Sequence, residues 1–548
     1  MRRAEGRDRP SMRLSVALMI VCVLLGVACT DDGDSSPPET TAAGFRQGGE
    51  LRLAAVEVQN LDPAAAVPTN QADMIAIDLM YDSLTVFPTG LGDDANSTDP
   101  DETRAVPDIA ESMQPNGDAT AWTVKLGART FSDGSPIRAA DVKASFERLA
   151  KRGSMSLPGV RLEIINGYQE VATGAAPEMS GLRVVDDSTL EIGLRESYIA
   201  LPELVASPLY AIVPKAAADQ GDAAFAAPVG SGPYAFVDRD DTRIRLERAS
   251  GAIGADVGPD VVELVEFATW ESAYQAFVGG QIDWSLVPAG ELDDATNTYG
   301  SDNFEFFGSE LWLGFNLRDP TFTDPRFRQA IVQAIDSEKV VADTLPGRWP
   351  LRAIVPREVP GYNDDACGAL CEFFPDAARA WLAQAFPAGG IPTVMLDGYE
   401  DPTQRAMLES VKEQLAAVGI PAELRMRPFE EYRAFVTSGQ QALFSFGWVG
   451  VAPMQDVYLA SLFQSASPDN VTGFRSPDID AQITSARANG DPQGRADDYG
   501  WIERQVLNQS VLVPIAQLRT NQVVADRVGG WSTRLDGTFV IGDVWVTD

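Results

Sequence analysis

The sequence predicts an α/β fold built from more than one folding unit. Its 548 residues are too many for a single hydrophobic core, so we expect roughly two to four units. The composition is that of a globular protein, with 45% hydrophobic and 22% charged residues. From Gly49 onward, strand-like runs alternate with helix-like runs, and this alternation is typical of α/β proteins.

The first elements of this alternation follow in order along the chain. Residues 49–56 (GELRLAAV) read as a strand, and residues 72–84 read as a helix with an apolar face that includes Met74, Ile77 and Met80. Residues 121–126 (AWTVKL) alternate as a strand does. Pro136 then precedes a helix whose predicted apolar face contains the following residues: Val142, Phe146 and Leu149.

The later elements include one helix start and one strand with an unusual end. Asp324 fits an N-cap and Pro325 the first helical position of a helix with an apolar stripe. Residues 442–446 (ALFSF) read as a buried strand, followed by the loop GWVGVAPMQD at 447–456. This loop places Trp448 at a strand tip, where open α/β sheets bind ligands. A Trp packed in the core at a turn is the alternative.

Charge and composition exclude several classes of function. The formal charge is -36 and the pI about 4.3, whereas a nucleic-acid binder needs a basic surface. We therefore expect no nucleic-acid partner and attribute the acidity to solubility. The chain has 0 histidines, which excludes Ser-His-Asp and Cys-His catalysis and most zinc, nickel and copper sites. Ser-Lys or paired-carboxylate chemistry stays open.

Three further motifs predict no cofactor or metal. GSGPYA at 230–235 matches G-x-G-x-x-A, but it leads into a strand instead of opening a helix, so it is not a dinucleotide site. The acidic loop at 92–102 lacks the mid-loop Gly and the Glu at position twelve of an EF-hand, and we expect it to be solvated. No G-x-x-x-x-G-K-[ST] occurs, so we expect a partner to hydrolyse any ATP.

The N-terminus has the features of an export signal. Arginines outnumber acids in residues 1–13, and an apolar run from Leu14 to Ala28 follows, which is short for a membrane span but fits a signal peptide. Small residues directly before Cys29 resemble a bacterial lipobox, although Gly26 stands where Leu is more usual. We expect residues 1–28 to be a signal peptide and Cys29 to carry lipid at the outer face of the cell membrane. Ordinary secretion with cleavage nearby is the alternative.

Two further features accompany export. Residues 29–48 are acidic and rich in Ser, Thr and Pro, so we expect a disordered tether. Cys367 and Cys371, in the run CGALC, are expected to form a disulfide in an oxidising compartment. A redox role is the alternative, and a metal site would need more ligands than the nearby sequence supplies.

The chain resembles the extracytoplasmic solute-binding proteins of family 5, the dipeptide- and oligopeptide-binding proteins of ABC importers. The matching pieces occur in order over roughly residues 49–530, and the block from Phe131 to Arg148 is the most specific. They are Leu61-Asp62-Pro63, YDSL at 81–84, PDIAES at 107–112, WTVKL at 122–126, FSDGSP at 131–136, Ala140-Asp141-Val142, SFER at 145–148, VGSGPY at 229–234, GQID at 280–283, Gly314-Phe315-Asn316, RFRQA at 326–330, Ala334-Ile335-Asp336, Gly419-Ile420 and Gly447-Trp448.

The resemblance implies a two-lobe fold of the periplasmic-binding-protein type II with an extra subdomain in the first lobe. We assign residues 49–314 to the first lobe, with the subdomain at about 85–180. Residues 315–514 then form the second lobe, and residues 515–548 return to the first. The crossings are expected near 313–317 and 511–517, where short apolar segments could act as hinge strands.

The resemblance also implies candidate ligand-binding residues. In peptide-binding members the loop reads roughly W-x-G-D, and its Asp pairs with the α-ammonium of the peptide. Counting from Trp448, that position is Val451, which cannot receive an ammonium group. Asp456 lies further along, in an expected helix, and is a possible replacement. The other candidates are Trp448 for stacking, Gly447 and Gly450 for backbone approach, and Asn316, Tyr274 and Arg352 in the cleft, Arg352 for a carboxylate.

The function implied is capture of a peptide or peptide-like solute and its delivery to the permease subunits of an ABC importer. The expected protein is a monomeric, lipid-anchored binder and not an enzyme. Val451 leaves two alternatives open. One is that the solute is an oligosaccharide or a metabolite without an ammonium group, and the other is that the chain is a regulatory or scaffold protein that has lost solute binding.

Overall fold

The structure is a computed structural model. The described residues form two six-stranded sheets, one four-stranded sheet and three two-stranded ribbons. They are residues 48–68, 70–88, 104–153, 162–250, 258–301, 303–306, 308–534 and 538–547. The expected signal peptide, Cys29, the tether up to residue 47 and the acidic loop at 92–102 lie outside them. None of the helices in this described part has the length and apolar content that a membrane span needs.

The first six-stranded sheet has the strand order β20-β11-β1-β10-β9-β8. Its strands are β1 (Glu50–Val56), β8 (Tyr234–Arg239), β9 (Arg243–Arg248), β10 (Val261–Phe267), β11 (Trp284–Leu286) and β20 (Gln522–Val524). β1 pairs with β10 in parallel along its whole length. Leu53 and Ala54 of β1 point to opposite faces of the sheet and are both fully buried, because a central strand with parallel neighbours is covered on both faces.

Helix α1 (Gln71–Met80) follows β1 and is shorter than the sequence predicts. Asn70 caps it by accepting hydrogen bonds from the backbone of Ala72 and Asp73. The helix ends where the GSG segment packs against it. A Cβ at Gly230 would lie 1.9 Å from the carbonyl oxygen of Met80, so this segment needs glycine for close backbone approach. The strand β8 follows, as expected.

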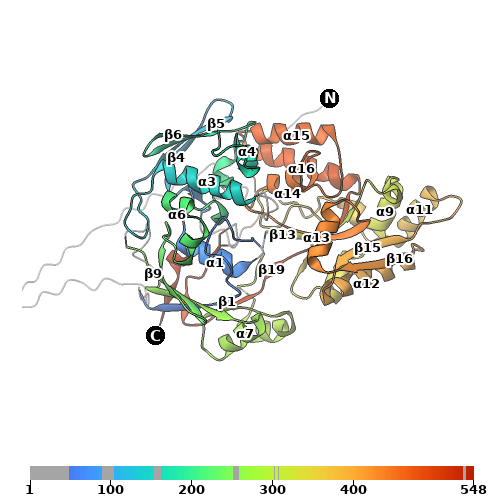
Figure 1. The fold of residues 1–548 in the computed structure, drawn as a ribbon. Coiled ribbons are helices and arrows are strands. Elements are labelled where there is room, and N and C mark those ends of the chain that lie inside the picture. The colour runs from blue at the N-terminus through green and yellow to red at the C-terminus, as the bar shows by residue number, and fades with distance from the viewer. Residues whose placement is uncertain are drawn as a thin grey trace, which may run out of the picture. The chain divides into compact units, whose positions relative to one another are not determined.

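The four-stranded sheet is antiparallel throughout, with the order β4-β5-β7-β6. Its strands are β4 (Ala110–Pro115), β5 (Ala121–Leu126), β6 (Leu182–Asp186) and β7 (Thr189–Gly193). Helix α3 (Ala139–Gly153) packs against it (Figure 1). The predicted apolar face of α3, with Val142, Phe146 and Leu149, is buried in this contact region.

The second six-stranded sheet has the order β14-β18-β13-β17-β15-β16. Its strands are β13 (Ser309–Phe315), β14 (Trp349–Pro350), β15 (Val394–Tyr399), β16 (Ala422–Arg427), β17 (Leu443–Val449) and β18 (Leu512–Gln517). Helix α9 (Pro325–Ala334) packs beside this sheet. The side chain of Asp324 accepts a hydrogen bond from the backbone of Arg326, which is the predicted cap.

The remaining helices cover the sheets or connect them, and α14, α15 and α16 pack against one another (Figure 1). They are α4 (Tyr168–Ala172), α5 (Leu201–Leu204), α6 (Lys215–Gln220), α7 (Trp270–Val278), α8 (Leu292–Tyr299), α10 (Ser337–Thr344), α11 (Pro375–Ala385), α12 (Pro402–Ala417), α13 (Phe429–Thr437), α14 (Gln455–Phe463), α15 (Pro477–Ala488) and α16 (Pro492–Asn508).

Two chain segments connect the first sheet with the second, and they pair with each other. The outgoing segment contains β12 (Glu305–Phe306) and leads into β13. The returning segment leaves β18, passes through β19 (Arg519–Thr520) and joins the first sheet at β20. β12 and β19 form an antiparallel pair, which we call the linker ribbon. The other two ribbons pair β2 (Thr85–Val86) with β3 (Val106–Pro107) and β21 (Val528–Gly529) with β22 (Trp545–Val546).

Candidate functional site

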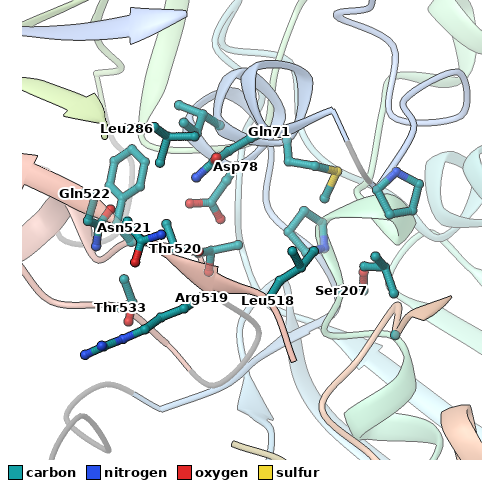
Figure 2. Close-up of a pocket in the computed structure, with 18 of the residues that line it drawn as sticks. Gln71, Asp78, Ser207, Leu286, Leu518, Arg519, Thr520, Asn521, Gln522 and Thr533 are labelled. Atoms are coloured by element: carbon teal, nitrogen blue, oxygen red, sulfur yellow. The ribbon is translucent and has the colours of Figure 1, made fainter. Parts of the chain in front are cut away.

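A cavity of about 300 Å³ lies between the loops of the two six-stranded sheets (Figure 2), and we call it the central cavity. The first sheet and α1 supply one side, the end of β17 supplies another, and the returning chain after β18 supplies a third. The lining residues are Pro68, Gln71, Met74, Ile75, Asp78, Ser207, Pro208, Leu209, Trp284, Leu286, Val287, Val449, Gly450, Val451, Leu518, Arg519, Thr520, Asn521, Gln522, Thr533, Thr538 and Phe539.

The cavity wall is mostly apolar, with uncharged polar groups and two charged side chains among the described residues. The charged ones are Asp78 and Arg519. Asp78 forms an ion pair with Arg534, at 3.5 Å between Oδ1 and Nη1. Arg519 donates hydrogen bonds from Nε and Nη2 to the carbonyl of Phe304, at 3.2 and 3.1 Å. An apolar cleft with a few placed polar groups is the usual make-up of a small-molecule site.

The strand that carries Trp448 is longer than the sequence predicts, so this side chain lies within β17 and not in the loop. β17 continues to Val449 because it pairs with β13 along its whole length, with Trp448 opposite Glu310. The Trp448 ring is buried and stacks on Phe446, with ring centroids 6.4 Å apart. It does not line the central cavity, whereas Val449, Gly450 and Val451 do.

Gly450 lies at a point of close contact. A Cβ at this position would be 2.3 Å from the hydroxyl oxygen of Tyr458. That hydroxyl donates a hydrogen bond to the carbonyl of Gly308, and the backbone N–H of Gly450 donates to the same oxygen, both at 2.9 Å. The glycine therefore lets the loop pass over Tyr458. Gly447 is exposed within β17, and a Cβ there would make only ordinary contacts.

Asp456 lies in the first turn of α14, in a helix as expected, and it is not in the central cavity. It lines a separate cavity of about 100 Å³. Its carboxylate accepts hydrogen bonds from Arg487 Nε at 2.8 Å, Tyr499 at 2.8 Å and Tyr198 at 3.1 Å. A buried charge needs such partners, so the structure gives Asp456 a role in holding α14, α15 and α16 together.

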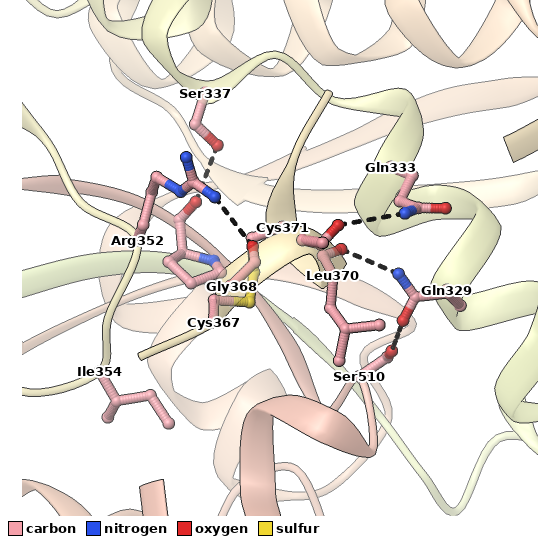
Figure 3. Close-up of a disulfide and its surroundings, with 12 residues drawn as sticks. Gln329, Gln333, Ser337, Arg352, Ile354, Cys367, Gly368, Leu370, Cys371 and Ser510 are labelled. Atoms are coloured by element: carbon pink, nitrogen blue, oxygen red, sulfur yellow. Dashed lines mark hydrogen bonds between the residues drawn. A yellow bond between two sulfur atoms is a disulfide. The ribbon is translucent and has the colours of Figure 1, made fainter. Parts of the chain in front are cut away.

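The three remaining candidates also lie away from the central cavity. Asn316 is buried, and its Nδ2 donates to the carbonyls of Gly439 and Gln441 at 3.0 and 2.8 Å. Tyr274 is buried on α7 and stacks on Phe277. Arg352 is half-buried, and Figure 3 shows its guanidinium donating to a backbone carbonyl of the disulfide loop.

The disulfide between Cys367 and Cys371 closes this loop, with Cα atoms 5.6 Å apart. Gln329 and Gln333 of α9 donate side-chain hydrogen bonds to carbonyls within it (Figure 3). Arg352 Nη2 donates to the third carbonyl, that of Gly368, at 2.8 Å. The disulfide and these three hydrogen bonds hold the loop beside α9.

Three buried carboxyl groups belong to β13, to the segment after β14 and to α16. Glu310, Glu358 and Glu503 each have one side-chain oxygen with no hydrogen-bond partner among the described residues. Burial raises the pKa of Glu358 and that of Glu503 to about 7. Burial and the charge of Glu503 raise the pKa of Glu310 well above its ordinary value. Burial of an acid without a counter-charge favours its neutral form.

Sequence reasoning missed Asp78, Ser207 and the segment at 518–522, although one signal was present. In the run QADMIAIDLM, Asp78 lies four residues after Met74, so a charge interrupts an otherwise apolar helix face. Such a charge indicates either a buried ion pair or a ligand-binding site. The other lining residues lie in segments with no distinguishing sequence pattern, and folding alone brings them together.

Comparisons with known proteins agree on one family. The family model described as bacterial extracellular solute-binding proteins, family 5 Middle, matches residues 104–470. A glutathione-binding protein, GsiB, of Salmonella choleraesuis is 23% identical over 461 residues, covering 79% of this chain and 83% of its own.

Solved structures share the fold. A clavulanic acid biosynthesis oligopeptide binding protein superimposes with a TM-score of 0.80 at 22% identity, covering 92% of this chain and 96% of its own. OppA of Haemophilus influenzae, in complex with the peptide RPPGFSPFR, gives a TM-score of 0.70 at 16% identity and covers 92% and 100%.

Proposed function

We propose, from the premise that this chain belongs to the bacterial extracellular solute-binding proteins of family 5, that it captures a peptide or peptide-like solute in the central cavity. The chain is a solute-binding protein of the type that serves ABC importers, with a two-lobe type II fold, and it is not an enzyme. The observation that carries the proposal is the cavity itself, because loops of both six-stranded sheets and the linker ribbon all contribute to it.

The chemistry of the cavity and the relatives support a peptide-like solute. Apolar walls from Met74, Leu286 and Val451 suit aliphatic side chains, while Asn521 and Gln522 carry amides that can bond a peptide backbone. Relatives are named for binding glutathione and oligopeptides. Of the predicted residues, we propose that Gly450 and Val451 contact the solute through the loop, and that Trp448 and Gly447 act by holding β17 in place.

We further propose that the chain is exported, lipid-anchored at Cys29 and docked on permease subunits of an importer. The predicted signal peptide at 1–28 and the acidic tether at 29–48 support this, because they would separate the folded part from the bilayer. The test is the mass of the protein extracted from its host membrane. A diacylated or triacylated peptide that begins at Cys29 supports the anchor, and a peptide that begins elsewhere without lipid rejects it.

We propose the domain division 49–314, 315–514 and 515–548, with a subdomain near 85–180. The distribution of strands supports its outline, because the first sheet draws on residues 50–286 and 522–524 and the second on residues 309–517. The four-stranded sheet, at residues 110–193, is separate from both. β13 and β18 both pair within the second sheet, so we place the crossings themselves in the linker ribbon.

Native mass spectrometry on the gently purified protein tests the proposed solute. We expect extra masses that match short peptides. A single non-peptide mass would show that the chain binds a different solute. A bare protein mass that does not change with a panel of peptides, oligosaccharides and metabolites would favour a scaffold protein and overturn solute capture.

A further inference from the structure

One buried carboxyl group, that of Glu358, lies where the returning segment leaves the second sheet. Gln517 is the last residue of β18 and lies two residues before β19 of the linker ribbon. Its Nε2 donates a hydrogen bond to Glu358 Oε2, and its Oε1 accepts one from the backbone N–H of Arg357 at 3.1 Å. These bonds tie the start of the returning segment to the chain that follows β14.

The same carboxyl group also lies next to the outgoing segment. A Cβ at Gly308, which directly precedes β13, would be 3.5 Å from Glu358 Oε1. The carbonyl of Gly308 accepts hydrogen bonds from the hydroxyl of Tyr458 and the backbone N–H of Gly450, both at 2.9 Å. Gly450 in turn lines the central cavity. Glu358 is therefore placed between the two connections, beside the residue that anchors the cavity loop.

The surroundings of Glu358 suit a neutral carboxyl group. The residue is buried, and its Oε1 has no hydrogen-bond partner among the described residues. The neighbouring cation, Arg357, lies over the rings of Trp349 and Tyr362, 5.5 and 5.4 Å from their centroids. Burial raises the pKa of Glu358 to about 7, and the hydrogen bond from Gln517 and the charge of Arg357 oppose this only in part.

The elements packed around this point bring no ion-pair partner to Glu358 within the described part of the chain. Tyr458 of α14 is a buried phenol, and the charges of Glu358 and Glu310 both disfavour its ionisation. The guanidinium of Arg519 donates to the carbonyl of Phe304. The titratable and charged groups on these elements are Glu310 of β13, Arg357 after β14, Tyr458 of α14, Glu503 and Arg504 of α16, and Arg519 of β19.

Loss of the proton from Glu358 therefore acts against the packing of the two connections. The neutral group leaves at most one O–H without a partner, whereas the ionised group places a negative charge there with one neutral hydrogen bond. Separation of the two segments would let water reach the carboxylate and solvate its charge. Ionisation consequently favours separation, and protonation favours the packed arrangement.

We propose that Glu358 is a pH-dependent latch at the base of the linker ribbon, which holds the outgoing and returning segments together when protonated and lets them separate more readily when ionised. The latch goes beyond solute capture and does not depend on which solute is bound. Its contribution is fully present below about pH 4.5 and is lost as pH rises through about 7, because the packed form binds the proton more tightly. If a solute occupies the central cavity, rising pH favours its release.

Native-state hydrogen exchange, measured by mass spectrometry of peptides, tests the latch without a solute. The purified protein and its Glu358→Gln variant are compared at pH 6 and at pH 8, under conditions where exchange reports the opening equilibrium. Gln keeps the acceptor for Gln517 and cannot ionise. If separation returns the pKa of Glu358 from about 7 to 4.5, the opening equilibrium rises about tenfold between pH 6 and pH 8. We expect the ratio of exchange rates, unmodified protein over variant, to rise by that factor at residues 308–311 and 516–522.

Three further comparisons separate the latch from a structural role. Glu431→Gln, on the exposed side of α13, should exchange as the unmodified protein does at both pH values. A rate ratio that is the same at pH 6 and pH 8 would overturn the latch. Exchange of the two segments only in step with the buried strand β1, at the same rate, would also overturn it, because the opening would then be global unfolding. In the unmodified protein alone, protection of the two segments that does not fall between pH 6 and pH 8 would overturn it without any variant.

Discussion

The stability of this protein should fall as pH rises through the range in which Glu503 ionises. Glu503 lies on α16 and is fully buried. Its Oε1 accepts hydrogen bonds from the backbone N–H groups of Ile354 and Val355, at 2.7 and 2.9 Å. Burial raises its pKa from 4.5 to about 7. The folded protein therefore holds a proton on this group in a range where the unfolded chain has already released it.

The sign and size of the effect follow from this difference. Since the folded state binds more protons, the contribution is fully present below about pH 4.5 and is lost as pH rises to about 7. At about 1.4 kcal/mol per pH unit, the loss in the free energy of unfolding is on the order of 3 kcal/mol. Glu503→Gln keeps a carbonyl acceptor and cannot ionise, so the variant should lose about that much less between pH 5 and pH 8.

Urea unfolding at pH 5, 6, 7 and 8 measures this difference. Glu431→Gln, on the exposed side of α13, is the matched control and should follow the unmodified protein. Glu358 and Glu310 remain ionisable, so a smaller pH dependence should persist in the Glu503→Gln variant. The reasoning is refuted if the unmodified protein and Glu503→Gln lose the same stability between pH 5 and pH 8.

Three further variants test other contacts. Asp456→Asn removes one of the two carboxylates that pair with the buried guanidinium of Arg487 and leaves that of Glu196. We therefore expect a loss of about 1.5–3 kcal/mol in the free energy of unfolding, and thermal unfolding that matches the exposed control Asp376→Asn would contradict this. Replacing Cys367 and Cys371 together by serine should lower the free energy of unfolding, measured in urea, by only about 2 kcal/mol, because the closed loop is short. A loss of about 5 kcal/mol or more would show that the disulfide stabilises the fold by more than restricting the unfolded chain. Gly450→Ala should displace Tyr458 and lower the free energy of unfolding by about 1–3 kcal/mol. Gly290→Ala is the control and should leave it unchanged, because a Cβ at Gly290 would meet nothing within 4 Å. Equal stability of the two variants would argue against the close contact at Gly450.

The family and the two-lobe α/β fold could be predicted from the sequence and are confirmed by the comparisons. The predicted starts of β1 and α9 agree with the structure because their signals are local. Asp324 and Pro325, for example, act within one helical turn of each other. The end of β17 was predicted too early, because its extension to Val449 depends on pairing with β13, more than a hundred residues before it in the sequence.

The surroundings of the candidate site residues could not be predicted for the same reason. The partners of Asp456 are Tyr198, Arg487 and Tyr499, which come from three separate segments. Whether an acid is open to a ligand or enclosed by its own chain depends on such distant partners. Asp78 was within reach of sequence reasoning, because a charge on an apolar helix face requires an explanation.

The linker ribbon limits how the two halves of the protein can move. Two paired connections define a line, and rotation about that line needs only small backbone changes, whereas twisting across it would break the pairing of β12 with β19. The two halves also meet away from the ribbon, where Arg487 pairs with Glu196 and Asp456 accepts a hydrogen bond from Tyr198, so a rotation about the ribbon must either keep or break these contacts. Thr520 lies in the linker ribbon and Leu518 directly before it, so we expect a solute contact with either residue to have little effect on such a rotation. Asp78 on α1 and Val451 after β17 line the cavity away from the ribbon. We therefore expect solutes long enough to contact both residues to favour closure of the two halves most strongly.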